Sequence, residues 1–288
     1  MSETICKEPW VWKIGRQRVL DLEQPLVMGV LNVTPDSFSD GGRFLEPERA
    51  VDRALEMRSQ GADIIDVGGE STRPSAPRIS PEVERQRVIP VIERLAEHKD
   101  VVISVDTQKA EVARLAVEAG ALIVNDINAA AQSPEMLDLV AESGCGYVSM
   151  HMQGTPQTMQ QAPAYSNVVA EVSEFFRQSL VCYEKYGVLL EQIVLDVGIG
   201  FGKTVDHNLE LLRHLVDFKK HGRPLLLGVS RKSFLGKILG AESTDDRLAA
   251  SLACVCWGMS ADVKIFRVHD VLETSQSVRM WRAIGASK

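Results

Sequence analysis

The sequence is poor in cysteine and aromatic residues, and it lacks both long apolar runs and an excess of positive charge. Its five cysteines, an odd number at irregular spacing, form no zinc-ligand pattern and predict reduced thiols. No run of about 18 apolar residues occurs, so we expect no membrane-spanning helix. The net charge of −7 and a pI near 5.5 argue against broad binding to nucleic acid or acidic membranes. An anionic substrate must therefore be held by a local cluster of cations.

The bulk composition is that of an ordinary globular protein. The chain has 288 residues, of which 45% are hydrophobic and 25% charged, and this length permits one large domain or two small ones. The stretch Met1–Trp10 carries Glu3, Lys7 and Glu8 and lacks the apolar core of a signal peptide, so we expect a cytoplasmic protein. Because no linker or low-complexity segment interrupts the chain, we expect a single domain over residues 1–288.

Short apolar runs recur along the chain, and nearly every one ends on a polar or charged residue. The eight runs are Leu26–Asn32, Ala62–Asp66 continuing to Gly69, Val101–Asp106, Leu122–Asn125, Gly146–His151, Ile193–Asp196, Leu225–Ser230 and Val263–Arg267. Because they do not alternate between polar and apolar residues, they are typical of strands buried on both faces of a parallel sheet.

Helical patterns separate these runs. They start at Pro47, Pro81 and Pro134, and they also cover Lys109–Ala119, Val168–Tyr183, Asn208–Lys220, Asp245–Met259 and Val271–Ile284. Eight strand–helix units in this length predict an α/β fold, a (β/α)8 TIM barrel, which typically takes about 250 residues. The alternative is a doubly wound open sheet, which usually has fewer strands, and no Gly-x-Gly-x-x-Gly opens the first helix.

A short segment precedes the first predicted strand. Within residues 1–24, Val11–Ile14 and Arg18–Leu20 flank Gly15-Arg16-Gln17 and predict an N-terminal β-hairpin that plugs the bottom of the barrel. At the opposite end, the carboxyl ends of the strands converge on one mouth, where active sites of such barrels lie. The side chains expected to approach this mouth are Asn32, Asp66, Asp106, Asn125, His151, Asp196, Ser230 and Arg267.

The loop after the first run is rich in side-chain oxygen. Thr34, Asp36, Ser37, Ser39 and Asp40 surround a lone aromatic residue, Phe38. Pro35 stiffens one side of the loop, whereas Gly41 and Gly42 loosen the other. This composition suits a mobile lid over a polar substrate, and a solvated surface loop is the alternative interpretation.

Three strand-end residues, Asp106, Asn125 and Asp196, supply two carboxylates and an amide from three different strands. Together they can read a heterocycle that bears both donors and acceptors, such as a guanine-like or pterin-like ring. Structural hydrogen bonding is the alternative. Metal binding by these three residues is disfavoured, because no nearby histidine or third carboxylate completes a ligand set.

Two stretches near the carboxyl terminus offer cations for an anionic group. Gly228–Phe234 follows the seventh run and begins a predicted helix, so that Ser230, Lys232 and Ser233 accompany backbone N–H groups. Arg267 and His269 add two groups at the eighth strand. In barrels, the loops near strands seven and eight often bind phosphate, and a solvated basic turn is the alternative.

Two further loops are candidates for ligand contact. Gly198–Lys203 is too rich in glycine for a helix and lacks the spacing of a P-loop. We interpret it as a loop that lets the backbone approach a ligand, with Phe201 as an apolar wall. Gly69–Pro74 follows the second run, and its Arg73 can clamp a leaving anion through two hydrogen bonds.

With these motifs the chain resembles the dihydropteroate synthase family of folate biosynthesis. The matching stretches are Gly29–Gly42, Glu70–Pro74, Gly200–Lys203 and Gly228–Phe234, together with Asn125-Asp126 and Arg267-Val268-His269. They are spread from the first strand to the eighth, so the resemblance covers nearly the whole chain. Val197 and Ser75 stand where the family usually has proline and glycine, and neither change removes a chemical group.

The resemblance implies a transferase that joins 4-aminobenzoate to (7,8-dihydropterin-6-yl)methyl diphosphate and releases pyrophosphate. It implies pterin contacts from Asp106, Asn125, Met150, Asp196, Lys232 and Arg267. It implies diphosphate contacts from Asn32, Thr72, Arg73, Arg267 and His269, with Asn32 also a ligand of Mg²⁺. The implied 4-aminobenzoate slot comprises Phe38, Thr72, Pro74, Phe201, Lys232 and Ser233, and the implied catalytic residues are Asp40, Arg73, Asp106 and Lys232.

The chemistry fits these expectations. Loss of pyrophosphate from an electron-rich dihydropterin leaves a delocalised cation, so we expect a dissociative reaction under closed loops that exclude water. The family also implies a homodimer and inhibition by sulfonamides, which mimic 4-aminobenzoate. The rival hypotheses are another pterin-binding barrel, such as a methyltetrahydrofolate-dependent methyltransferase, and a catalytically silent binding protein on the same barrel.

Overall fold

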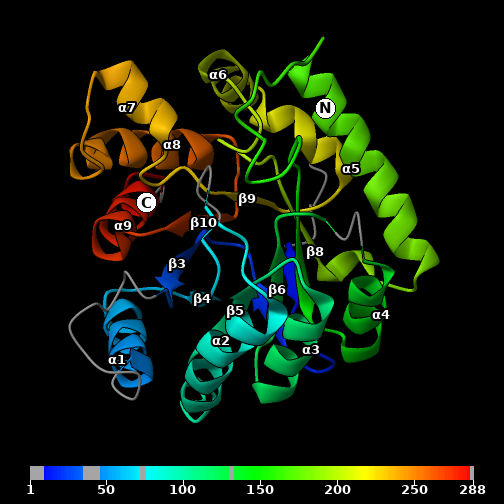
Figure 1. The fold of residues 1–288 in the computed structure, drawn as a ribbon. Coiled ribbons are helices and arrows are strands. Elements are labelled where there is room, and N and C mark those ends of the chain that lie inside the picture. Colours follow the sequence, from blue (N-terminus) through cyan, green and yellow to red (C-terminus); the bar gives the residue numbers. More distant parts are fainter. Residues whose placement is uncertain (1–9, 35–45, 72–75, 130–132, 286–288) are drawn as a thin grey trace, which may run out of the picture.

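The computed structural model describes residues 10–34, 46–71, 76–129 and 133–285. Within this part of the chain, eight parallel strands close into a barrel in the order β10-β3-β4-β5-β6-β7-β8-β9 (Figure 1). The strands are β3 (Leu26–Asn32), β4 (Ile64–Gly68), β5 (Val102–Asp106), β6 (Ile123–Asp126), β7 (Gly146–Met150), β8 (Ile193–Asp196), β9 (Leu225–Leu227) and β10 (Ile265–Val268). The predicted barrel is confirmed, and every predicted strand is present in order.

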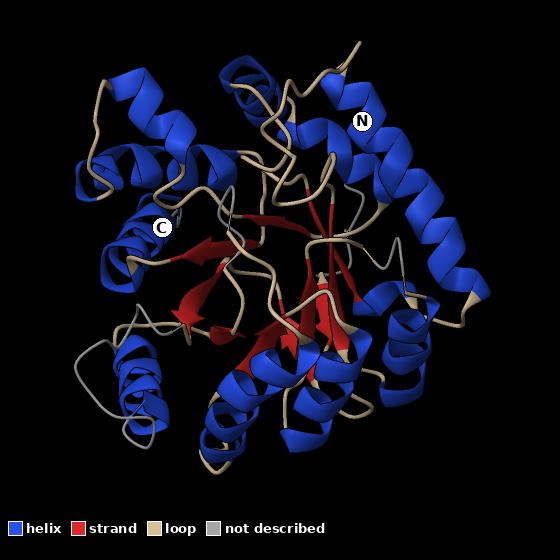
Figure 2. Ribbon diagram, in the orientation of Figure 1, coloured by secondary structure: helices blue, strands red, loops and turns tan. Residues whose placement is uncertain are grey.

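Helices surround the strands on the outside (Figure 2). They are α1 (Glu46–Ser59), α2 (Pro81–Ala96), α3 (Ala110–Ala119), α4 (Pro134–Ser143), α5 (Val168–Lys185), α6 (Val205–Arg213), α7 (Ser233–Leu239), α8 (Leu248–Ser260) and α9 (Val271–Gly285). Local signals set several ends: the Ser80 side chain accepts from the N–H of Val83 at 3.3 Å, and Gly120 ends α3 at φ 119°. Among the described helices, none has both the length and the apolar content needed to cross a bilayer.

The single helix predicted over Asn208–Lys220 was wrong. α6 is capped by Thr204, whose hydroxyl accepts from the N–H of His207 at 3.2 Å, and it ends at Arg213. A 3₁₀ helix, Leu215–His221, then continues the chain. Its buried residues, Leu215 and Phe218, are three positions apart, a spacing that fits an α-helix and a 3₁₀ helix equally well.

The predicted hairpin is present and closes the bottom of the barrel. β1 (Val11–Lys13) and β2 (Val19–Asp21) pair antiparallel. Trp12 is fully buried, and its indole Nε1 donates to the carbonyl oxygen of Gln192 at 2.7 Å. The hairpin packs on an inner apolar layer of the strands, which comprises Met28, Ile64, Val102, Ile123, Val148, Val194, Leu226 and Ile265.

The inward face of the barrel changes from apolar to polar over two residues in most of its strands. Because alternate residues of a strand point to the same side, the side chain two positions after each apolar layer residue also faces inward. Five of these eight positions are polar, namely Asp66, Ser104, Asn125, Asp196 and Arg267, and the other three are Val30, Met150 and Gly228. The sheet thus places a polar layer directly above an apolar plug, at the carboxyl mouth.

Candidate active site at the barrel mouth

Arg267 joins the polar residues of the mouth into one cluster. Its Nε donates to Oδ2 of Asp66 at 2.6 Å, and its Nη2 donates to Oδ2 of Asp106 at 2.5 Å. The amide Nδ2 of Asn125 donates to the same Oδ2 of Asp66 at 2.9 Å. Asp66, Asp106 and Asn125 are buried, whereas the Arg267 side chain is 21% exposed. The cluster is therefore in contact with solvent through the guanidinium of Arg267.

Burial and neighbouring charges shift the pKa values of this cluster in opposite directions. Burial raises the pKa of Asp106 to about 7; the charge of Arg267 opposes that rise, and the neighbouring carboxylate of Asp66 adds to it. Burial alone would lower the pKa of Arg267, but Asp66 and Asp106 outweigh it and raise that pKa. Asp106 is therefore a carboxyl group that changes charge near neutral pH.

Asp196 and Lys232 form a second part of the mouth. Oδ1 of Asp196 accepts from the N–H of Gly198 at 2.7 Å, and Lys232 Nζ donates to the carbonyl oxygen of Ile199. Burial lowers the pKa of Lys232 to about 8, while the charge of Asp196 opposes the shift. Burial likewise raises the pKa of Asp196, and Lys232 opposes it. Lys232 Nζ also lies 4.6 Å from the ring centroid of Phe201, over its face.

A hydrogen-bonded turn carries Lys232 to the mouth. The Oγ of Ser230 is within 3.1 Å of both the backbone nitrogen and Nδ1 of His269. Arg231 has φ 60° and binds the carboxylate of Asp270 through Nε and Nη2 at 3.2 and 2.5 Å. These contacts tie the segment after β9 to the segment after β10. Lys232 and the exposed Ser233 directly follow the segment that is tied in this way to His269 and Asp270.

The sequence reasoning missed Lys203, which lies buried beside the mouth. Its Nζ lies 2.9 Å from the carbonyl oxygen of Phe201, 3.3 Å from that of His151 and 3.1 Å from Nδ1 of His151. Burial lowers the pKa of Lys203 to about 7, yet three acceptors match the three N–H donors of the ammonium form. Lys203 thus fixes the Phe201 loop against the end of β7.

Gly198 shows how closely this loop approaches β7. It has φ 69°, and a Cβ atom there would lie 1.9 Å from the carbonyl oxygen of His151. Only glycine fits such an approach. His151 was expected at the mouth, but its ring is engaged by Lys203 and packs edge-on against Phe175, with ring centroids 4.9 Å apart.

Asn32 ends its strand as predicted, whereas β7 ends at Met150, one residue before the predicted end at His151. Asn32 ends β3 and pairs in register with Gly68, whereas Met150 ends β7, is buried and pairs with Asp196. Asn32 offers an amide oxygen, the hard type of ligand that Mg²⁺ prefers. Within the described residues, no group of three or more His, Cys, Asp and Glu side chains gathers to hold a metal.

Five predicted residues, and with them the predicted lid, lie outside the described residues: Phe38, Asp40, Thr72, Arg73 and Pro74. The residues that flank the second of these loops are held firmly. Oε1 of Glu70 accepts from the N–H of Ile79 at 3.0 Å, and its Oε2 accepts from Lys109 at 2.7 Å. Glu70 therefore links Ile79, on the far side of the loop, to Lys109, the residue that precedes α3.

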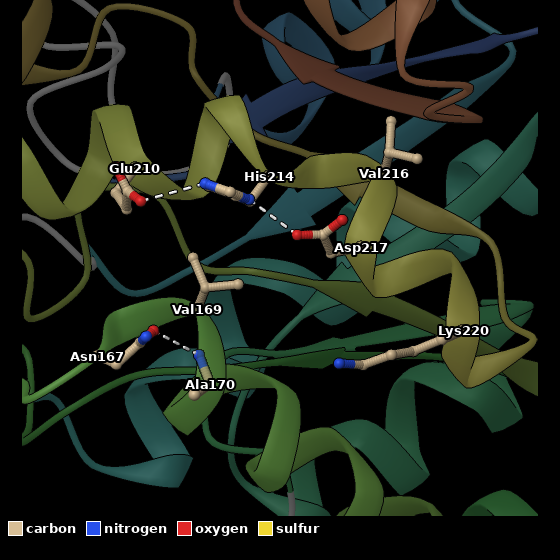
Figure 3. Close-up of a pocket in the computed structure, with 8 residues that line it drawn as sticks. All are labelled: Asn167, Val169, Ala170, Glu210, His214, Val216, Asp217 and Lys220. Carbon is tan, nitrogen blue, oxygen red and sulfur yellow. Dashed lines mark hydrogen bonds and ion pairs between the residues drawn. The ribbon is translucent and has the colours of Figure 1, made fainter.

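A cavity of about 600 Å³ lies away from the mouth, between α5 and α6 (Figure 3). Three of its ionisable side chains pair locally, because His214 contacts Glu210 at 3.2 Å and Asp217 at 2.8 Å. Glu210 lies in α6 and Asp217 in the 3₁₀ helix that follows it. None of the predicted site residues that the structure describes lines the cavity, so we place the candidate active site at the mouth.

A closed parallel barrel with a polar cluster at its carboxyl mouth defines the class of barrel enzymes that bind a polar ring there. The family described as "Pterin binding enzyme" matches residues 28–269. A dihydropteroate synthase of Escherichia coli is 48% identical over 93% of this chain and 95% of its own length. The chain therefore belongs to the dihydropteroate synthase family of pterin binding enzymes.

Solved structures agree with this assignment. Xanthomonas albilineans dihydropteroate synthase with 4-aminobenzoic acid has a TM-score of 0.91 and 42% identity, covering 98% of this chain and all of that one. Yersinia pestis dihydropteroate synthase in a sulfonamide drug complex has a TM-score of 0.88 and 42% identity, covering 95% of this chain and 98% of that one.

Proposed function

We propose that this chain condenses (7,8-dihydropterin-6-yl)methyl diphosphate with 4-aminobenzoate to give 7,8-dihydropteroate and pyrophosphate. The observation that carries the proposal is the mouth itself, where Asp106, Asn125 and Asp196 converge with Lys232 and Arg267 in a member of this family. The pterin methylene loses its C–O bond to diphosphate and gains a C–N bond to the aryl amine, which releases one proton.

In this proposal the pterin ring is read by groups from four strands. Asp196 accepts N–H groups of the aminopyrimidinone edge, Asn125 contributes its amide, and Lys232 donates from the neighbouring loop. Met150 packs against the ring. Asp106 stabilises positive charge that develops on the dihydropterin as the leaving group departs. Asp40, from the loop after β3, and Arg73, from the loop after β4, also stabilise charge as the diphosphate departs.

The diphosphate is held by cations and by a metal ion. Arg267 and His269 bind its oxygens, and Thr72 and Arg73 complete the set. Asn32 would hold Mg²⁺ together with the diphosphate, the usual division between protein and phosphate at magnesium sites. When bound, the ion would supply positive charge to the leaving group. Departure of pyrophosphate before amine attack needs no covalent enzyme nucleophile.

The 4-aminobenzoate slot lies beside the Phe201 loop. Lys232 Nζ over the ring of Phe201 gives this wall both an apolar face and a positive charge, which suits an aromatic carboxylate. Ser233 lies next to it at the start of α7, and Phe38, Thr72 and Pro74 complete the slot. A sulfonamide presents the same aryl amine with an acidic group opposite, so the slot admits it as well.

A second copy of this chain is the partner we propose. α7, α8 and α9 are neighbours on one side of the barrel (Figure 1). They expose large apolar side chains to solvent, namely Leu239, Trp257, Met280, Trp281 and Ile284. Such patches mark protein interfaces in soluble proteins. Light scattering should give a mass near twice 31.7 kDa, and a mass of one chain at micromolar concentration would refute the dimer.

The experiment that tests the function measures pyrophosphate release from the pterin diphosphate, with and without 4-aminobenzoate and Mg²⁺. We expect release that depends on both, with dihydropteroate formed in equal amount. A sulfonamide should inhibit competitively against 4-aminobenzoate, because both bind beside Phe201. Tight binding of the pterin diphosphate without release under any condition would favour a silent binding protein or another pterin enzyme.

A further inference from the structure

Asp66 lies at the centre of the polar cluster, although the proposed chemistry gives it no contact with substrate. It is 0% exposed in the middle of β4. Its Oδ2 accepts from Asn125 and Arg267, whereas its Oδ1 has no hydrogen-bond partner among the described residues. A buried carboxylate with one oxygen that accepts no hydrogen bond destabilises the folded protein. Its presence here therefore points to a functional role.

The contact with Asn125 fixes which way that amide faces. An isolated amide can rotate by 180° and exchange its donor and acceptor. A carboxylate accepts hydrogen bonds only, so the group that faces Asp66 at 2.9 Å is the NH₂ of Asn125. The carbonyl Oδ1 of Asn125 is then turned away from Asp66. Asn125 therefore presents an acceptor to a ring in the mouth.

The contact with Arg267 fixes the plane of its guanidinium group. Nε and Nη2 belong to the same edge of the guanidinium, and they bind Asp66 and Asp106 on different strands. Two bonds along one edge hold the flat group across the mouth. Nη1 and the two faces of the guanidinium are oriented by this arrangement.

We propose that Asp66 is a positioning residue that holds Asn125 as a hydrogen-bond acceptor and Arg267 in a fixed plane, and thereby sets which ring edge the site accepts. The ring favoured is one that presents N–H groups to Asn125 and Asp196, as an aminopyrimidinone does. This inference rests on the proposed function, because the pterin is the ring that meets these residues.

The test is Asp66→Asn, which keeps the shape of the side chain and removes its charge. We expect the KM for the pterin diphosphate to rise at least about tenfold, because the hydrogen bonds from Asn125 and Arg267 lose their charged acceptor and the asparagine amide no longer dictates which way Asn125 faces. The KM for 4-aminobenzoate should stay within about twofold, because Asp66 touches nothing in the Phe201 loop.

The pH profile supplies a readout that a merely structural role would not move. The negative charge of Asp66 helps to raise the pKa of Asp106. Its removal should therefore shift the acid limb of kcat/KM to lower pH. Asp63→Asn is the matched control, because Asp63 is partly buried just before β4, at the end of the strand opposite the mouth, and accepts from the N–H of Val27 at 2.8 Å. It should change neither the pterin KM nor the acid limb.

Two results would overturn the inference. One is an Asp66→Asn protein that folds and keeps the wild-type pterin KM and pH profile while the wild type turns over. If that variant does not fold, Asp66→Glu is measured in its place, because it keeps the charge but moves it by one methylene. A wild-type pterin KM in Asp66→Glu is the second result that would overturn the inference. A wild type that neither binds the pterin diphosphate nor releases pyrophosphate would instead refute the proposed function.

Discussion

Lys232→Ala should weaken binding of the pterin diphosphate about a hundredfold, because it removes a charged donor from a water-poor site. Lys232 also supports its neighbours. Its charge lowers the pKa of Asp196, and its Nζ lies over the Phe201 ring. Without it the pKa of Asp196 rises further. Burial also lowers the pKa of Lys232 itself to about 8, so the wild-type lysine carries more charge at pH 6 than at pH 8, and the loss of affinity should be larger at pH 6.

Titration calorimetry with the pterin diphosphate in Mg²⁺ measures this effect directly. Lys237→Ala is the matched control, because Lys237 lies on α7, the helix that directly follows Lys232, and is exposed. It should bind within about twofold of wild type, as substitutions away from a site usually do. An affinity of Lys232→Ala within a factor of about three of wild type would remove Lys232 from the pterin site.

The sequence was sufficient for most of the fold because the barrel has a simple physical signature. Strands buried on both faces read as unbroken apolar runs, and each run is followed by a helical pattern with its own start or stop residue. β3 and β8 were predicted with their observed bounds, Leu26–Asn32 and Ile193–Asp196. The helix ends were harder, and the 3₁₀ segment Leu215–His221 shares its apolar spacing with an α-helix.

The site was predictable as a set of residues but not as a network. Parallel strands in a barrel bring their carboxyl ends together, so Asp106, Asn125 and Asp196 were expected to converge. The bond between Asp66 and Arg267 joins residues 201 positions apart and depends on the closure of β10 against β3. The buried Lys203 gave no signal beyond its place after a glycine-rich loop. Its importance follows only from the three acceptors around it.

Asp106→Asn should lower kcat by about 10² to 10³ while it changes pterin affinity much less, because asparagine keeps an acceptor of the same size and loses the charge that opposes the developing cation. The sign of the pH effect follows from the raised pKa. Below pH 7 the buried carboxyl of Asp106 takes up a proton, so kcat/KM of the wild type should fall as pH drops through about 7.

The same substitution should remove that acid limb, since asparagine does not titrate. Initial rates of pyrophosphate release between pH 5.5 and 8.5, at saturating 4-aminobenzoate, compare the wild type, Asp106→Asn and the control Asp63→Asn. The control should retain the wild-type limb, because Asp63 lies just before β4, at the end of the strand opposite the mouth. If Asp106→Asn retained the limb, the titrating group would be another residue, and the stabilisation of the pterin cation would have to be assigned elsewhere in the mouth.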